Sequence, residues 1–303
     1  MIISVVQLGT VDYATGLRLQ QRLVELRKNN EVANVLLLLE HTPVITLGRN
    51  ARRNNVLASD ELLQQRGVEL FECDRGGDVT YHGPGQLVGY PIFDLRSFLG
   101  PDGRRKTLGA VEYVRRLEEA LIRTCADYGI ATERVAGMTG VWTQLSTAVI
   151  PSGPNDPELV EGERAQSRDP YPTHESQAKI AAIGVHISRG VTSHGFALNV
   201  TDQPLEYFQL IVPCGISSKP VTSLEQQLCG PGLRSGARGS EARATPSMDD
   251  VAQALARNFG RVFNSQIVWV DSLDALLGRS VGVPTRAPEE LRKMVGEEDT
   301  FWV

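Results

Sequence analysis

Three short segments of the sequence combine residue types that can perform group-transfer chemistry. The longest, residues 75–86, reads RGGDVTYHGPGQ and contains four glycines. Glycines allow the backbone to approach a ligand closely and let several N–H groups face one cavity, and the polar residues of the run add side-chain donors. The alternative is a hairpin loop whose polar groups bond only to one another. Neither GK[ST] nor GxGxxG occurs in this run, so nucleotide binding is not supported.

A second segment brings a lysine next to apolar residues. Lys179 begins the run KIAAIGV, which is typical of a buried strand. A lysine that enters such a run can hold its amine in a poorly solvated site, where burial disfavours the ammonium and a nearby thiolate favours it. The alternative is a lysine at a strand end whose amine reaches solvent. His194 begins a further apolar run, and by itself it fits a structural histidine as well as a functional one.

The third segment is Pro213-Cys214-Gly215. A cysteine between proline and glycine lies in a turn with little bulk on either side, which exposes the sulfur and can offer the backbone N–H of Cys214 or Gly215 to an oxyanion. Among the four cysteines of the chain, we expect Cys214 to be a nucleophile. The other three fit structural or incidental roles: Cys73, Cys125 and Cys229.

Taken together and in this order, the segments resemble the lipoyl(octanoyl) transferases of the biotin/lipoate protein ligase superfamily. The resemblance covers residues 1–264, and Cys214 follows Lys179 by 35 residues. It implies that an octanoyl group moves from octanoyl-acyl carrier protein to one lysine of a lipoyl domain. The implied acceptors are the lipoyl domains of 2-oxo-acid dehydrogenases and the glycine cleavage H protein.

The resemblance also implies roles for individual residues. Cys214 matches the nucleophile that carries the octanoyl group as a thioester, and Lys179 matches the residue that favours its thiolate and moves the proton. The residues that match the acyl pocket of the family are Arg75, Gly76, Gly77, Asp78, Val79, Thr80, Tyr81, His82, Ala182, Ile183, Gly184, His194, Gly195 and Phe196.

The chemistry of these residue types agrees with that implication. A free thiol is mostly protonated at pH 7, and a neighbouring ammonium favours the thiolate. Exchange of one thioester for another needs no ATP, and the later attack by an amine must release a proton that Lys179 or His82 could accept. Two alternatives stay open: an ATP-dependent lipoate or biotin ligase on the same fold, and a non-catalytic protein that binds lipoyl domains.

The rest of the sequence predicts the elements that must position these segments. Strands and helices are both long and show no regular βαβ repeat, which favours an α+β fold: a single domain like the biotin/lipoate protein ligases, with a mixed sheet flanked by helices. We predict helices over residues 14–28, 60–65, 107–128, 221–228 and 248–263. Strands are expected over residues 35–39, 43–47, 68–73, 87–94, 130–134, 141–144, 180–187 and 195–200, with residues 75–86 as a loop.

Three segments do not resemble core. Residues 150–176 are rich in proline and residues 230–247 in Gly, Ser, Ala and Arg, which indicates surface insertions; residues 271–303 are charged and indicate an appended tail. The predicted organisation is therefore a catalytic domain over residues 1–270 with two insertions, followed by a C-terminal extension.

Composition limits the partners of the protein. The formal net charge of −5 excludes a generally basic nucleic-acid binder, although Arg49, Arg52 and Arg53 could form a local basic patch for an acidic donor. No run reaches the length of a membrane helix, and the five histidines lack metal-ligand spacing. We thus expect a cytoplasmic enzyme, monomeric, with no metal and no cofactor, and no nucleic-acid or membrane partner.

Overall fold

The computed structural model describes residues 1–98, 107–144, 177–215, 219–229 and 245–280. The first predicted insertion lies outside these ranges, as does the second except for its last three residues. Most of the predicted C-terminal extension also lies outside them. Within the described residues no helix is long and apolar enough to cross a membrane.

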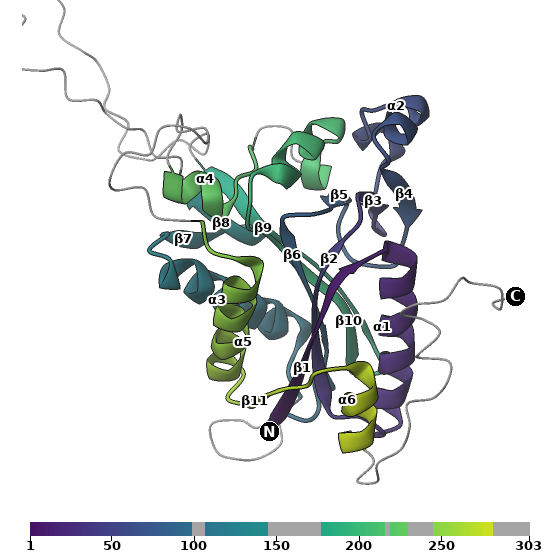
Figure 1. Ribbon diagram of the computed structural model, residues 1–303, viewed down its shortest axis with the longest axis vertical. Coiled ribbons are helices and arrows are strands. Elements are labelled where there is room, and N and C mark those ends of the chain that lie inside the picture. The colour runs from purple at the N-terminus through teal and green to yellow at the C-terminus, as the bar shows by residue number, and fades with distance from the viewer. Residues whose placement is uncertain (99–106, 145–176, 216–218, 230–244, 281–303) are drawn as a thin grey trace, which may run out of the picture.

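A mixed sheet of eight strands forms the centre of the described fold (Figure 1). Its order is β11-β1-β2-β6-β10-β9-β8-β7. Strand β1 pairs in parallel with β2 and β11, and all other neighbours are antiparallel. The strands are β1 (Ile2–Val11), β2 (Asn34–His41), β6 (Gln86–Ile92), β7 (Thr132–Val135), β8 (Met138–Gln144), β9 (Gln177–Ser188), β10 (Val191–Asn199) and β11 (Gln266–Trp269).

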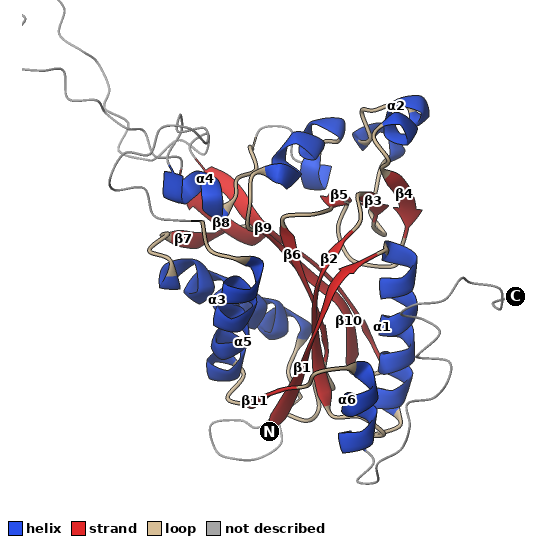
Figure 2. Cartoon of the chain, viewed as in Figure 1, coloured by secondary structure: helices blue, strands red, loops and turns tan. Residues whose placement is uncertain are grey.

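Helices cover both faces of this sheet (Figure 2). One face carries α1 (Tyr13–Lys28) and α6 (Leu273–Ser280), and the other carries α3 (Ala110–Asp127) and α5 (Met248–Val262). Two shorter helices, α2 (Asp60–Gln65) and α4 (Leu224–Cys229), lie at the periphery. The predicted α+β class, a mixed sheet flanked by helices, is confirmed.

The sequence of β2 explains why helices lie on both faces. Side chains alternate between the two faces of a strand, and β2 is apolar at every position from Val35 to Leu39. Val35, Leu37 and Leu39 pack in the cluster under α1, whereas Leu36 and Leu38 pack in the cluster under α3 and α5. A continuous apolar run of this kind is stable only when both faces are buried.

A second sheet of three strands, in the order β4-β3-β5, lies at one end of the large sheet (Figure 1). It consists of β3 (Val44–Leu47), β4 (Glu69–Glu72) and β5 (Val79–His82). Strand β5 corrects the prediction that all of residues 75–86 form a loop. Val79 and Tyr81 alternate with polar residues and bury their side chains in the core of this small sheet, which is enough to form a strand between glycine-rich turns.

The C-terminal part of the described chain also corrects a prediction. Residues from 271 onward were expected to lie outside the core, yet Leu273 and Leu276 of α6 are buried in the same cluster as α1. Strand β11, which directly precedes this helix, pairs with β1, and α6 therefore begins at the edge of the sheet and packs on it. Leu273 and Leu276 therefore form the buried face of a helix.

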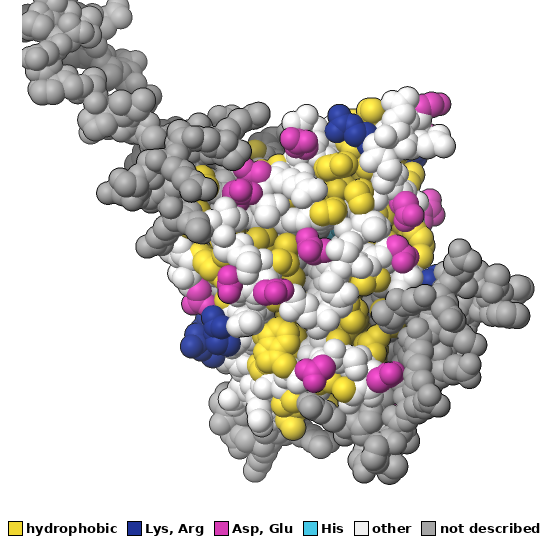
Figure 3. Space-filling view, in the orientation of Figure 1, with side chains coloured by type: hydrophobic (Ala, Val, Ile, Leu, Met, Phe, Trp, Pro, Cys, Tyr) yellow, Lys and Arg dark blue, Asp and Glu magenta, His cyan; other side chains and the backbone are white. Residues whose placement is uncertain are grey.

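On the face seen in Figure 3, the described acidic side chains are scattered rather than gathered in one place. The face seen in Figure 3 carries more Asp and Glu than Lys and Arg among its described side chains. This distribution accords with the net charge of −5.

Candidate active site

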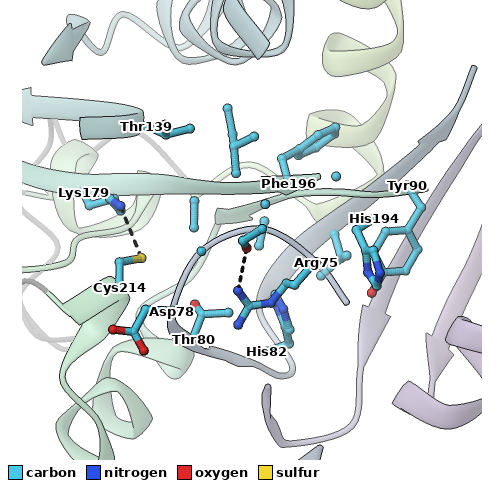
Figure 4. A pocket seen from close by; sticks show the side chains of 18 of the residues that line it. Arg75, Asp78, Thr80, His82, Tyr90, Thr139, Lys179, His194, Phe196 and Cys214 are labelled. Carbon is cyan, nitrogen blue, oxygen red and sulfur yellow. Dashed lines mark hydrogen bonds between the residues drawn. The ribbon is translucent and has the colours of Figure 1, made fainter. Parts of the chain in front are cut away.

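Cys214 and Lys179 meet at one side of a cavity between the two sheets (Figure 4). The Nζ of Lys179 donates a hydrogen bond to the Sγ of Cys214 over 3.3 Å. Lys179 is buried, while Cys214 is partly exposed. The pair thus combines a reachable sulfur with an amine held away from bulk water.

The backbone of Lys179 is fixed from both sides of β9. Its N–H donates to the carbonyl of Pro220, and its carbonyl accepts from the N–H of Thr222. Strand β8 pairs with it on the other edge, where Trp142 is its partner in register. Because residues 220–222 and β8 hold this position on its two edges, the stem of the lysine leaves the sheet in a defined direction.

Cys214 lies in the short 3₁₀ turn Pro213–Gly215 in a left-handed conformation, with φ of 54°. A bond to the loop between β3 and β4 holds the start of this turn: the N–H of Val212 donates to the carbonyl of Asn55 over 2.7 Å. Gly215 packs against the Asp78 carboxylate, so a Cβ there would come within 2.5 Å of an oxygen. With φ of 68° as well, the position after Cys214 requires glycine.

The structure narrows the expectation that the N–H of Cys214 or of Gly215 could face an oxyanion. The N–H of Gly215 donates to the carbonyl of Val212 over 3.1 Å, and it is therefore not available to an oxyanion. Of the two backbone donors that the sequence offered, the N–H of Cys214 is the one that remains.

The glycine-rich segment forms the floor of the cavity. Arg75 is buried, and its guanidinium donates to the side chain and the carbonyl of Thr46 and to the carbonyl of Gly76. Asp78 accepts from the N–H groups of Arg52 and Val79 and from the side-chain amide of Asn55. These bonds tie the segment to the loop that also holds the cysteine turn.

Strand alternation separates the predicted pocket residues of β5 into two groups. Thr80 and His82 line the cavity, whereas Val79 and Tyr81 point into the core of the small sheet. The structure brings the other predicted residues of the site together around the cavity. Those lining it are Arg75, Gly76, Gly77, Asp78, Thr80, His82, Lys179, Ala182, Ile183, Gly184, His194, Gly195, Phe196 and Cys214.

His82 is held in one tautomer by a buried network. The amide of Gln86 donates to Asn199 and to the carbonyl of Tyr81, so its oxygen accepts the 2.7 Å bond from Nδ1 of His82. Nε2 of His82 therefore carries the lone pair. Burial, reinforced by the nearby His41, lowers the pKa of His82 to about 3, and the ring is neutral near pH 7.

Two further histidines, His186 and His194, share one carboxylate, that of Asp74. Asp74 accepts from Nε2 of His194 over 2.8 Å and also from Nδ1 of His186. Burial lowers the pKa of His194, and Asp74 opposes this shift. Burial also opposes ionisation of Asp74, but the hydrogen bonds from the two rings outweigh it and lower the pKa of Asp74.

Residues at both ends of the cavity were not found from the sequence. Its empty volume, including solvent at the open mouth, is about 870 Å³. Figure 4 shows Cys214 and Lys179 on one side and Tyr90 with His194 on the other. Gly137, in the turn between β7 and β8, is the one sequence signal that could have indicated the missed residues Met138 and Thr139. The missed residues are Tyr13, Val88, Tyr90, Gly137, Met138, Thr139 and Ala197.

The other cysteines and the three arginines that the sequence singled out do not line the cavity. Cys125 is fully buried on α3, and Cys73 and Cys229 are partly exposed. Arg49, Arg52 and Arg53 are exposed, and Arg53 forms an ion pair with Asp60. Their role toward an acidic donor stays a prediction.

The buried histidines predict a loss of stability in acid. Burial lowers the pKa of His41 to about 4 and that of His82 to about 3, whereas both rings titrate near 6.5 in an unfolded chain. As the pH falls from about 6.5 toward 4, the unfolded state binds protons that the folded state does not. The free energy of unfolding should fall by about 1.4 kcal/mol per pH unit for each histidine.

The measurement is urea unfolding at pH steps between 4.5 and 7, on the wild type and on His82→Gln. Because glutamine does not titrate, the variant should lose about 1.4 kcal/mol per pH unit of that slope. An unchanged slope in a variant that unfolds cooperatively would contradict the assignment of His82 as a buried neutral ring.

The chain is similar in sequence to a known protein family and in fold to a solved structure. Residues 12–260 match the model of the lipoyl protein ligase A/B catalytic domain. The chain is 53% identical to the octanoyltransferase of Koribacter versatilis (strain Ellin345) over 97% of both chains. It is 54% identical to the octanoyltransferase of Acidobacterium capsulatum over 91% of this chain and 96% of the relative. A crystal structure of lipoate-protein ligase A bound with ATP superimposes with a TM-score of 0.58 at 14% identity, covering 98% of this chain and 100% of that one; this likeness concerns the fold.

Proposed function

Because this chain belongs to the lipoyl protein ligase A/B catalytic domain family and is an acyltransferase like its octanoyltransferase relatives, we propose that it transfers an octanoyl group from octanoyl-acyl carrier protein to a lysine of lipoyl domains. The group travels as a thioester on Cys214. The observation that carries the proposal is the 3.3 Å contact between the amine of Lys179 and the sulfur of Cys214 beside the cavity.

In the first step the thiolate of Cys214 attacks the carbonyl carbon of the donor thioester. A carbon–sulfur bond to Cys214 forms, the bond to the carrier's sulfur breaks, and the carrier thiol leaves with a proton from the ammonium of Lys179. One thioester replaces another, so the step needs no nucleotide. A cation beside the sulfur favours the thiolate that this attack requires.

In the second step the amine of the acceptor lysine attacks the thioester on Cys214. The carbon–nitrogen bond forms, the carbon–sulfur bond breaks, and Cys214 leaves as the thiolate. The amine gives up a proton, and Lys179, neutral after the first step, accepts it and becomes the ammonium again. Each turnover therefore returns both residues to their starting states.

The walls of the cavity suit a hydrocarbon chain. Val88, Ile183, Phe196 and Ala197 are apolar residues among those that line the cavity. Burial of an alkyl chain contributes about 0.8 kcal/mol per methylene, so an octanoyl tail supplies several kcal/mol of binding. Lipoyl domains of 2-oxo-acid dehydrogenases and of the glycine cleavage H protein are the acceptors we propose.

The test is incubation of the purified protein with octanoyl-acyl carrier protein in the absence of nucleotide, followed by intact-mass measurement. We expect a mass increase of one octanoyl group, which disappears when a lipoyl domain is added and reappears on that domain. Acylation that requires ATP, with no adduct on the enzyme, would instead indicate a ligase that activates the free acid.

A further inference from the structure

The indole of Trp142 lies against the amine of Lys179. The Nζ of Lys179 is 4.7 Å from the centre of the Trp142 ring system, and the indole is 1% exposed. The two residues are also register partners on β8 and β9. A cation within about 6 Å of an indole face is attracted by the ring's negative charge density, and the attraction grows when water is excluded.

We propose that Trp142 is a positioning residue that holds the ammonium of Lys179 against the sulfur of Cys214. The inference rests on the proposed function and adds a residue to it. A lysine amine ends a flexible stem of four carbons and has no fixed direction of its own. The structure gives this amine a hydrogen bond to the thiol and a contact with the indole.

The backbone next to Trp142 is shaped to allow this contact. Gly140 has φ of 123°, and a Cβ there would come within 2.6 Å of the carbonyl of Ala181 and 3.6 Å of the Nζ of Lys179. The register between β8 and β9 shifts between Val141 and Trp142. Val141 pairs with Ala181 and Trp142 with Lys179, so the extra residue of this bulge is Ile180 on β9. A bulge bends the strand that carries it, and here it places Lys179 opposite the indole.

A buried carboxylate fixes this irregular stretch of strand. Glu118 of α3 is 1% exposed and accepts the N–H of Gly140 over 3.2 Å. Its charge is balanced by Arg115 and Arg134. Glu118 of α3 thus bonds to Gly140, two residues before Trp142 on β8. The indole of Trp142 contacts the amine of Lys179, and this amine donates to the sulfur of Cys214.

A second lysine uses the same ring. The Nζ of Lys219 lies 5.8 Å from the centre of the Trp142 ring system and donates to the side chain of Gln177. The indole is thus in contact with two amines, and the nearer one, that of Lys179, donates to the sulfur of Cys214.

The test measures the rate at which iodoacetamide alkylates Cys214 at pH values between 5.5 and 9. Peptide mass mapping identifies the alkylated residue. Trp142→Phe keeps an aromatic face and Trp142→Leu does not. We expect alkylation at pH 7 to slow about tenfold in Trp142→Leu and much less in Trp142→Phe, with the pH of half-maximal rate moved upward. In a Lys179→Met background, Trp142→Leu should cause no further loss, because the indole acts through the lysine.

Equal losses in the two Trp142 variants, or an undiminished loss in the Lys179→Met background, would overturn the inference. If Trp142→Leu fails to fold, fluorinated tryptophans test it without a change of shape, in a background where the other two tryptophans are replaced by Trp269→Phe and Trp302→Phe. Ring fluorination withdraws electron density, so the alkylation rate should fall stepwise with the number of fluorines; a constant rate would refute the role of the indole.

The assay needs neither donor nor acceptor, which separates the two proposals. An alkylation rate that depends on Trp142 in a protein that transfers no octanoyl group would overturn the proposed function alone. Octanoyl transfer with an alkylation rate that ignores Trp142 would overturn this inference alone.

Discussion

Cys214→Ala should yield no octanoyl adduct and should lower the transfer rate by on the order of 10⁴-fold or more, because removal of a covalent nucleophile leaves only binding and electrostatic contributions. The sulfur lies in an exposed turn beside the acyl cavity and has an amine at 3.3 Å. The measurements are intact mass after incubation with octanoyl-acyl carrier protein and the initial rate of lipoyl-domain acylation.

Two matched variants make this result specific. Cys229→Ala removes another partly exposed thiol, at the end of α4, and should leave adduct and rate unchanged. Cys214→Ser keeps a smaller, weaker nucleophile in the same left-handed turn and should acylate slowly if at all. An adduct of full yield on Cys214→Ala, or its loss on Cys229→Ala, would place the covalent step on a different residue.

The sequence allowed the two residues of the sulfur–amine pair to be predicted better than the shape of the cavity. Lys179 and Cys214 were identified by their neighbours, an apolar run and a Pro-Gly frame, which are properties of a few adjacent residues. Their contact depends on Val212 bonding to Asn55 and on Lys179 being paired on both edges. Those partners lie far away in the sequence, and no local pattern indicates them.

The residues of β5 show how a short strand hides inside a loop pattern. The run of glycines around Val79 and Tyr81 indicated a loop, and all four residues of the strand were expected at the pocket. Alternation sends Thr80 and His82 to the cavity and the other two to the core of the small sheet. The HPHP pattern of VTYH was the available signal, but four residues give weak periodicity.

Two further features, the bonding of the Gly215 N–H and the packing of helix α6, could not be predicted for other reasons. The geometry of a turn decides which backbone groups bond to each other, and Gly215 donates to Val212 because the turn is 3₁₀. Helix α6 lies in a charged segment, and only the pairing of β11 with β1 brings Leu276 onto the sheet. The first outcome follows from local turn geometry and the second from a tertiary contact, and composition encodes neither.

Lys179 is expected to perform two separable tasks, and its replacements should separate them. Lys179→Met removes both the positive charge beside the sulfur and the group that moves the proton. We expect acyl transfer to fall by about 10²- to 10⁴-fold, the range of a positioned general acid–base. Single-turnover measurements follow adduct formation from the donor and its decay on addition of a lipoyl domain.

Lys179→Arg keeps the charge but cannot release a proton, because guanidinium stays protonated in proteins. The thiolate that starts the first step is favoured by charge alone, so adduct formation should be slowed less in the arginine variant than in the methionine variant. The attack of the acceptor amine must transfer a proton to the residue at this position, so decay of the adduct should be slowed about equally in both. Full activity of Lys179→Arg in the second step would show that another base accepts the proton, and His82, whose Nε2 carries a lone pair in the same cavity, would then be the group to replace.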